Sequence, residues 1–162
     1  MHYDIAIIGY GPVGAMAANM FGSSDLNIVV IEPKKEIWDI PRAVALDGQA
    51  QRIFQSCGII NDIPVNPIDG LTFINKKGQK LVYVDFTEHS TPNGYSETVG
   101  FSQPNLERTL RSRAELYKNI TFKLGSSLSG LIATENNNEL TVINNLTNNT
   151  EIISSTYLLA CD

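Results

Sequence analysis

The chain has 162 residues, 43% of them hydrophobic, and a formal net charge of −5 at pH 7. This length and composition predict one soluble globular domain with a real core and exclude a fibrous, disordered or membrane-spanning chain. The acidic balance and the scattered lysines argue against a nucleic-acid surface. The N-terminus enters an apolar segment at once, without a basic leader or a cleavage site, so we expect a cytoplasmic protein.

The apolar pattern of the first half predicts a βαβ opening followed by irregular structure. The expected elements are a strand at 3–8, a helix at 12–22, a strand at 27–32, a loop through Pro41 and an amphipathic helix at about 47–57. Two further apolar runs, 71–74 and 81–86, flank a turn that contains Gly78, and this arrangement predicts a hairpin. A polar loop follows at 87–94.

The second half reads as one helix and then strands. Pro104 fits the first turn of a helix that keeps its apolar spacing to Tyr117. Four strands are expected after it, at 120–124, 128–134, 140–144 and 152–160. The asparagine-rich stretches 136–138 and 145–150 are turn-prone, so we expect them at hairpin tips.

The cysteines and histidines form no metal-binding pattern. Cys57 and Cys161 are far apart in sequence, so buried free thiols are expected rather than a disulfide. His2 and His89 are the only histidines, and two histidines alone cannot complete a zinc site. No metal is therefore expected.

A glycine motif joins the first strand to the first helix. Gly9 allows the tight turn, Gly11 lets the backbone approach a pyrophosphate, and Gly14 allows close packing of helix on strand. The pyrophosphate would lie at the helix N-terminus, beside Pro12 and Val13, where unpaired N–H groups favour an anion.

Glu32 ends the second strand about twenty residues after the motif, where a dinucleotide-binding fold places the carboxylate that binds the ribose. A carboxylate there suits an adenosine ribose with free hydroxyls and would repel a phosphate on that ribose. The pattern indicates a cofactor that contains ADP. A glycine-rich turn without a ligand is the alternative.

Longer segments resemble the single-component, FAD-dependent aromatic hydroxylases, most closely the 3-(3-hydroxyphenyl)propionate and phenol hydroxylase group. They are EIWDIPRAV at 36–44, RIFQSCG at 52–58, FSQPNLE at 101–107 and YLLACD at 157–162. The resemblance implies an α/β, glutathione-reductase-like Rossmann fold. Its parallel sheet is interrupted by an antiparallel meander from about Leu128 onward, and 71–100 is an excursion toward a substrate-binding sheet.

The resemblance also assigns cofactor contacts. It places Arg42 near the FAD pyrophosphate with Ala43 beside it, Gln103 on the ribityl or phosphate portion, and Asp162 on the ribityl chain. Leu128 would border the adenine through its backbone. Pro33 follows the ribose carboxylate where many relatives carry a basic residue, and Gly48 stands where close relatives show an acid. Arg108 and Arg111 are expected to be solvated charges or structural pairs.

The function implied is hydroxylation of a small phenolic or aromatic substrate with NAD(P)H and O2. No residue of the chain can be assigned as a catalytic acid or base. Later flavin motifs and most of the substrate domain are absent, so we expect 1–162 to be the N-terminal part of the FAD-binding domain. Alternatives are a non-catalytic nucleotide-binding module, an NAD-dependent dehydrogenase and another flavoprotein of this fold. A homo-oligomer is left open.

Overall fold

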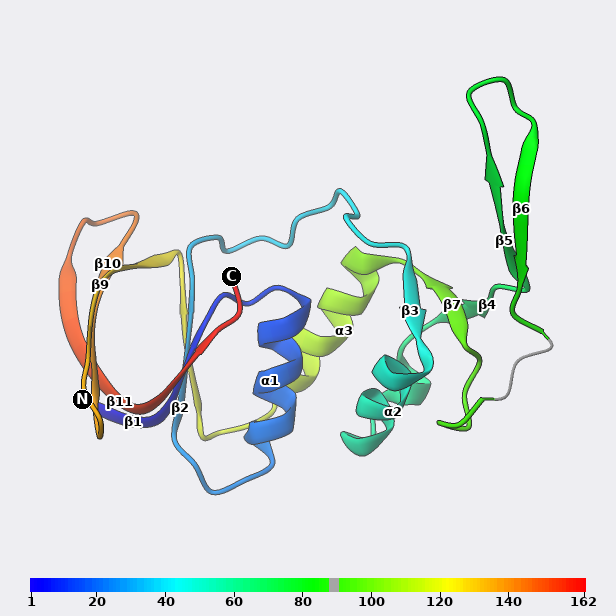
Figure 1. Cartoon of the computed structure of the whole chain (residues 1–162). Helices are drawn as coiled ribbons and strands as arrows, with labels where there is room; N and C mark the ends of the chain where they lie inside the picture. The colour runs from blue at the N-terminus through cyan, green and yellow to red at the C-terminus, as the bar shows by residue number, and fades with distance from the viewer. Residues whose placement is uncertain (88–90) are drawn as a thin grey trace. The chain divides into compact units, whose positions relative to one another are not determined.

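The computed structural model describes residues 1–87 and 91–162, and His89 and part of the expected loop at 87–94 lie outside them. Two compact units form, one from residues 1–39 and 107–162 and the other from residues 40–106. Figure 1 shows the elements of each unit.

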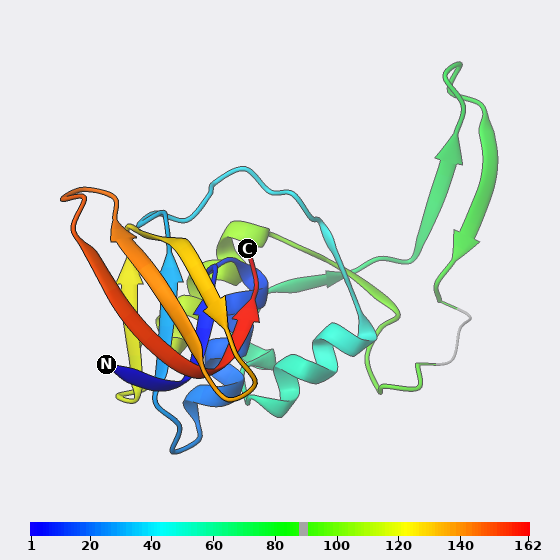
Figure 2. The ribbon, with the colours of Figure 1, turned by 60° about the vertical axis from the view of Figure 1, so that its left-hand side comes forward.

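The first unit is built on a six-stranded sheet with the order β8-β2-β1-β11-β10-β9. Its strands are β1 (His2–Ile8), β2 (Ile28–Glu32), β8 (Ile120–Leu124), β9 (Ser126–Ala133), β10 (Asn138–Asn144) and β11 (Thr150–Ala160). Strands β8, β2, β1 and β11 are parallel, and β10 pairs antiparallel with both β9 and β11. The expected parallel sheet with an antiparallel meander is confirmed, as the colours in Figure 2 allow the reader to follow.

Two helices cover the opposite side of the parallel strands from the meander (Figures 1 and 2). They are α1 (Pro12–Gly22) and α3 (Gln103–Ala114), of which residues from Glu107 onward belong to this unit. The Asn19 side chain donates hydrogen bonds to the carbonyl oxygens of Ala15 and Leu110, both at 2.8 Å, so it joins α1 to α3.

A hydrophobic core lies between the parallel strands and the meander. It contains Tyr3, Ala6, Ile8, Val29, Ile31, Leu140, Val142 and Ile153. Ile7 and Val30 alternate with core residues along their strands, and they are fully buried too. Strands buried on both faces read as continuous apolar runs, which is why the pattern of β1 and β2 was so clear in the sequence.

The second unit contains a small sheet, a hairpin and a helix. Strand β7 (Thr98–Phe101) lies between β3 (Ala45–Asp47) and β4 (Val65–Pro67) and is antiparallel to both. The predicted hairpin is confirmed as β5 (Gly70–Ile74) paired with β6 (Lys80–Asp85). Helix α2 (Gly48–Ser56) begins where Asp47 Oδ1 accepts a hydrogen bond from the N–H of Ala50, at 2.8 Å. A 3-10 turn, η1, follows at Ile60–Asp62.

Two expectations need correction. The helix expected to reach Tyr117 ends at Ala114, because Leu116 and Tyr117 make tight turn bonds to Arg113 and Ala114, and the Tyr117 ring then packs beside Gly22. Cys57 and Cys161 are free thiols as expected, but both are half-buried rather than buried.

Candidate functional site

The glycine motif forms a tight turn between β1 and α1. Gly9 has a φ of +93°, a left-handed conformation that favours glycine. A β-carbon on Gly14 would stand 2.0 Å from the carbonyl oxygen of Gly9, so only glycine lets the helix approach the turn. The N–H of Gly9 donates to the carbonyl oxygen of Ile31 at 2.8 Å, which ties the turn to the end of β2. The packing reasons inferred for Gly9 and Gly14 agree with this geometry.

Gly11 differs from the two glycines that flank it. A β-carbon there would meet no atom of the described residues within 4 Å, and the φ of −71° suits any residue. The protein itself therefore gives no reason for glycine at this position. In the part of the chain that the structure describes, no side chain caps the N-terminus of α1; its first turn carries no acidic residue, and Val13 is 66% exposed. An open, uncapped helix N-terminus fits a pyrophosphate.

Glu32 lies at the carboxyl end of β2 and faces the turn. Its Oε2 accepts a hydrogen bond from the backbone N–H of Tyr10 at 2.7 Å, and its Oε1 accepts one from the N–H of Lys34 at 2.9 Å. A carboxylate offers about four acceptor positions, so these two bonds leave capacity for ribose hydroxyls. The side chain is half-buried, within reach of solvent and of a ligand.

Asp162 lies beside the same turn. The N–H of Cys161 donates to the carbonyl oxygen of Ile8 at 2.7 Å, and the backbone nitrogen of Asp162 lies 2.8 Å from the position of a β-carbon on Gly9. The structure thus brings Gly9, Glu32 and Asp162 together at the carboxyl ends of three neighbouring parallel strands. In open α/β sheets, ligands bind at this edge.

Pro33 and Leu128 have other surroundings. Pro33 is exposed, and its carbonyl oxygen accepts a hydrogen bond from the side chain of Asn145 at 3.2 Å. Leu128 pairs with Val142 in the meander and packs, partly buried, against the hydrophobic core. The Leu128 side chain is thus used in packing against the core. A contact with adenine would have to be made by the Leu128 backbone, as the family resemblance implies.

In the second unit, Gln103 binds the backbone of the PRA segment. Its Oε1 accepts hydrogen bonds from the N–H groups of Arg42, at 2.8 Å, and Ala43, at 2.9 Å. Gln103 is buried, whereas Arg42 and Ala43 are exposed. The family resemblance assigned Gln103 to the cofactor directly. The structure shows a further role, since its carboxamide oxygen fixes the segment that carries Arg42.

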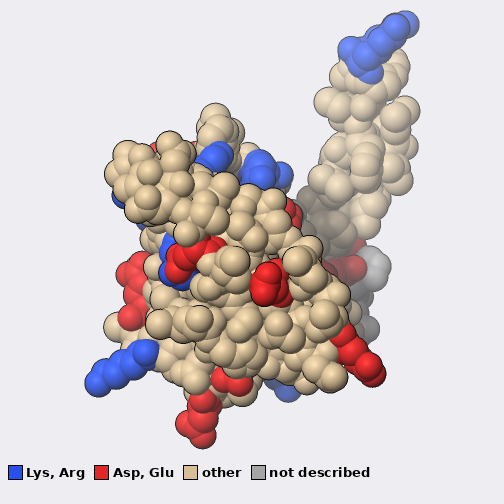
Figure 3. All heavy atoms as spheres, turned by 90° about the vertical axis from the view of Figure 1, so that its left-hand side faces the viewer, with Lys and Arg blue, Asp and Glu red and all other residues tan. Residues whose placement is uncertain are grey.

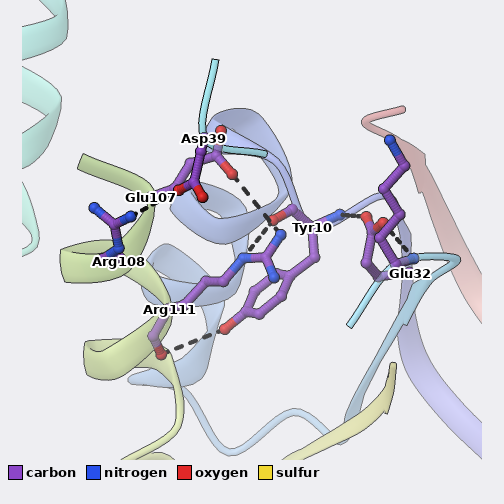
Figure 4. Close-up of polar contacts among 7 residues, drawn as sticks. Tyr10, Glu32, Asp39, Glu107, Arg108 and Arg111 are labelled. Atoms are coloured by element: carbon purple, nitrogen blue, oxygen red, sulfur yellow. Dashed lines mark hydrogen bonds and ion pairs between the residues drawn. The ribbon is translucent and has the colours of Figure 1, made fainter. Parts of the chain in front are cut away.

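Sequence reasoning missed a contact between Tyr10 and Arg111 (Figure 4). Arg111 Nε donates to the carbonyl oxygen of Tyr10 at 3.0 Å, and its guanidinium lies 4.6 Å from the centroid of the Tyr10 ring. The phenol of Tyr10 donates to the carbonyl oxygen of Arg111 at 3.4 Å. Burial of the ring raises the pKa of Tyr10, and Glu115 adds to the rise.

Of the two alternatives expected for Arg108 and Arg111, solvated charges or structural pairs, the structure shows structural pairs for both. Arg111 is buried and lies 3.8 Å from the carboxylate of Glu107, one helical turn away. Arg108 is exposed and pairs with Asp39 at 2.8 Å. The spacing of Glu107 and Arg111 was the sequence signal for the buried pair, but nothing in it indicated Tyr10 as the partner.

A cavity of about 510 Å³ opens between the segment after β2 and α3. It is lined by Lys35, Glu36, Ile37, Asp39, Arg108, Arg111, Ser112, Glu115 and Leu124. Leu124 pairs with Glu32 in the sheet, so the cavity lies on the side of Glu32 that faces away from β1. Its lining mixes both signs of charge and does not select an anion by itself.

Among the described residues, no three His, Cys, Asp or Glu side chains are grouped so as to hold a metal ion. None of the helices that the described residues form is long and apolar enough to cross a membrane. Figure 3 shows Lys and Arg interspersed with Asp and Glu on the face drawn, apart from the tip of the β5–β6 hairpin, whose turn carries Lys76 and Lys77.

A parallel sheet with an open glycine turn after β1 and a carboxylate, Glu32, at the end of β2 defines the class of dinucleotide-binding folds. The family model described as "FAD binding domain" matches residues 2–162. The chain therefore belongs to this family of FAD-binding domains, and FAD is its cofactor.

The curated relatives include hydroxylases of aromatic acids. The chain is 33% identical over 129 residues to the 3-(3-hydroxy-phenyl)propionate/3-hydroxycinnamic acid hydroxylase of Paraburkholderia xenovorans (strain LB400), a match that covers 78% of this chain and 20% of the relative. It is 27% identical over 162 residues to the enzyme of the same name from Escherichia coli (strain K12), which covers 98% of this chain and 28% of the relative. The chain thus spans less than a third of the length of these relatives.

Solved structures show the same fold. The crystal structure of p-nitrophenol 4-monooxygenase PnpA from Pseudomonas putida DLL-E4 matches with a TM-score of 0.88 at 15% identity, over 99% of this chain and 41% of that one. The flavin-dependent monooxygenase PieE, in complex with FAD and substrate, matches with a TM-score of 0.86 at 18% identity, over 100% of this chain and 30% of that one. The expected fold class is confirmed.

Proposed function

We propose that the chain binds the ADP half of FAD on the turn between β1 and α1, as part of a flavoprotein that hydroxylates phenolic or aromatic substrates with NAD(P)H and O2. The observation that carries the proposal is the contrast among the three glycines. Gly9 and Gly14 are required by the protein's own packing, whereas Gly11 faces open space at an uncapped helix N-terminus. A ligand that approaches the backbone supplies the reason for glycine there.

The individual residues take the following roles. The backbone of Gly9, Gly11, Val13 and Gly14 would bind the pyrophosphate, with Pro12 starting the helix without an N–H group of its own. Glu32 would bind the adenosine ribose, followed by Pro33, and Asp162 would bind the ribityl chain. Arg42, Ala43, Gln103 and the backbone of Leu128 complete the set that the family resemblance assigns. Bound FAD would supply the redox chemistry, with electrons from NAD(P)H and oxygen from O2.

The family and the relatives' names support an aromatic substrate, and the substrate site itself would require more protein than residues 1–162. Residues 71–100 would lead toward a substrate-binding sheet. The β5–β6 hairpin supports this, because it exposes large apolar side chains along both strands: Leu71, Phe73, Ile74, Leu81, Val82 and Tyr83. Exposed apolar patches of this kind mark surfaces that other protein covers. A cytoplasmic location and a homo-oligomer stay predictions.

The experiment is a binding titration. We would add FAD to the purified chain, follow the visible absorbance of the flavin, and measure competition by ADP. The variant is Gly11→Val, whose side chain would enter the pyrophosphate position, and the matched control is Gly100→Ala, where a β-carbon meets its nearest neighbour at 3.7 Å. Both variants are expected to fold like the wild type.

Loss of both FAD and ADP binding in Gly11→Val, with binding retained in Gly100→Ala, is the expected result. Binding retained by Gly11→Val would overturn the site assignment. Binding of ADP without FAD by the wild type would favour the second candidate, a nucleotide-binding module without turnover.

A further inference from the structure

We propose that Arg111 is a positioning residue for the nucleotide-binding turn and that it acts through Tyr10. The proposal rests on the proposed function, because the turn is the part of the chain assigned to the pyrophosphate. Arg111 belongs to α3 and is 101 residues from Tyr10 in sequence. Neither residue was assigned a role at the cofactor by the sequence.

Tyr10 stands between two glycines, the residues with the widest backbone freedom. The structure fixes the peptide groups on both sides of its α-carbon. The N–H of Tyr10 donates to Glu32 Oε2 at 2.7 Å, and its carbonyl oxygen accepts from Arg111 Nε at 3.0 Å. Both bonds involve a charged partner, so they are stronger than bonds between neutral groups. Glu32 and Arg111 thus hold the Gly9-Tyr10-Gly11 segment from opposite sides.

The Tyr10 side chain strengthens the same contact. Its ring is fully buried, with the Arg111 guanidinium 4.6 Å from the ring centroid and the Phe122 ring at 5.3 Å. Its phenol returns a hydrogen bond to the carbonyl oxygen of Arg111 at 3.4 Å. A cation over an aromatic face is an attractive arrangement, and it is stronger where water is excluded. Backbone and side chain of Tyr10 are therefore both bound to one residue of α3 (Figure 4).

Arg111 is poorly suited to contact a phosphate directly. It is 8% exposed, and the Glu107 carboxylate lies 3.8 Å from its guanidinium and offsets its charge. Its effect on a nucleotide must pass through the turn. A turn that is already ordered before binding loses less conformational freedom when the ligand arrives, so it binds more tightly. Arg111 would raise the affinity for a pyrophosphate by ordering the N–H groups that receive it.

The test compares Arg111→Lys with Arg108→Lys. Both arginines lie on α3 and both changes keep the charge, but only the first removes the Nε–H that binds Tyr10. Two quantities are measured: amide hydrogen exchange of Tyr10, Gly11 and Val13 in the ligand-free protein, and the dissociation constant for ADP. Exchange at Leu140 and Val142, in the core strand β10, reports overall stability.

In Arg111→Lys we expect the turn amides to exchange faster relative to the β10 amides. We also expect the dissociation constant for ADP to rise about tenfold, because one charge-assisted hydrogen bond is lost. Arg108→Lys should match the wild type in both. If Arg111→Lys does not fold, Tyr10→Leu takes its place, since it keeps an apolar side chain and removes the ring beneath the guanidinium.

Unchanged turn exchange in the variant would overturn the proposal, as would acceleration of the β10 amides by the same factor, because Arg111 would then have a merely structural role. Weakened ADP binding without faster turn exchange would also overturn it. A wild type that does not bind ADP would refute the proposed function, whereas the exchange data would still decide whether Arg111 orders the turn.

Discussion

The carboxamide oxygen of Gln103 accepts hydrogen bonds from two successive backbone N–H groups, those of Arg42 at 2.8 Å and Ala43 at 2.9 Å. One buried side chain at the start of α3 thereby determines the path of an exposed segment 60 residues earlier. The exposed segment has no regular secondary structure of its own. Its conformation at these two residues depends on that oxygen.

Replacement of Gln103 by alanine is expected to destabilise the protein by about 1–3 kcal/mol, because the N–H groups of Arg42 and Ala43 lose their acceptor. Gln103→Glu retains a side-chain oxygen and should recover most of the loss. Thermal unfolding followed by circular dichroism measures both. Gln55→Ala, at an exposed position of α2, is the control and should stay within about 0.5 kcal/mol of the wild type. If Gln103→Ala and Gln55→Ala lose the same amount of stability relative to the wild type, the prediction is contradicted.

Gly14→Ala is expected to destabilise the fold by about 3 kcal/mol or more, because the new β-carbon would stand 2.0 Å from a backbone oxygen that cannot move freely. Gly11→Ala, three residues earlier, should unfold like the wild type, since its β-carbon meets nothing within 4 Å. Denaturant unfolding of the two variants is the measurement. A Gly14→Ala protein as stable as Gly11→Ala would show that the approach of α1 to the turn is looser than described.

Glu32 should discriminate between nucleotides by their ribose substituents. ADP is expected to bind more tightly than its 2′-phosphorylated form by roughly tenfold or more, because the added phosphate would face the Glu32 carboxylate. Glu32→Gln keeps a side-chain oxygen as acceptor for the Tyr10 N–H and removes the negative charge. It should therefore reduce the difference in affinity between ADP and its 2′-phosphorylated form. Calorimetric titration of both nucleotides into both proteins tests this. Equal affinities in the wild type would count against Glu32 as the ribose ligand.

Stability should fall at alkaline pH through Tyr10. Burial raises the pKa of its phenol in the folded protein, so the folded state holds the proton more tightly than the unfolded state. The stabilisation that protonated Tyr10 contributes is complete below the pKa of its phenol in the unfolded chain, which is about 10. It is lost as the pH rises above that value, by up to about 1.4 kcal/mol per pH unit. Urea unfolding from pH 9 upward should show a steeper decline for the wild type than for Tyr10→Phe.

The control for this comparison is Tyr157→Phe, which removes the hydroxyl of an exposed tyrosine. The stability of Tyr157→Phe should fall with rising pH as steeply as that of the wild type. If Tyr10→Phe and Tyr157→Phe follow the same curve, the alkaline loss of stability arises from other groups.

Local sequence patterns predicted the parts of the fold that local physics determines. The apolar runs of β1 and β2, the turn at Gly9 and the hairpin around Gly78 each express a backbone preference within a few residues. Strands β3, β4 and β7 were missed because each has only three or four residues and exists through pairing with the others. A strand of that length has no periodicity to detect.

The same distinction applies to the candidate site. The roles of Gly9 and Gly14 in packing followed from residue type and spacing, because the turn is short and nearly rigid. The contacts of Gln103 with Arg42 and of Arg111 with Tyr10 could not be predicted, since they join positions about 60 and 100 residues apart through tertiary packing. The cofactor contacts assigned to all of the site residues, Glu32 and Arg42 as much as Leu128 and Asp162, stay predictions.

The register of β1 and β11 pairs His2 with Ser154 and Ile8 with Ala160. Strand β2, which pairs with the other edge of β1, is synthesised soon after β1. Strand β11 is synthesised some 150 residues later than β1. Contacts of such large sequence separation raise the contact order and slow folding, because the entropy of a long loop is lost before the pairing forms. During translation the edge of β1 that pairs with β11 therefore stays unpaired until nearly all of residues 1–162 have left the ribosome. The contact between Gly9 and Asp162 forms only after that point.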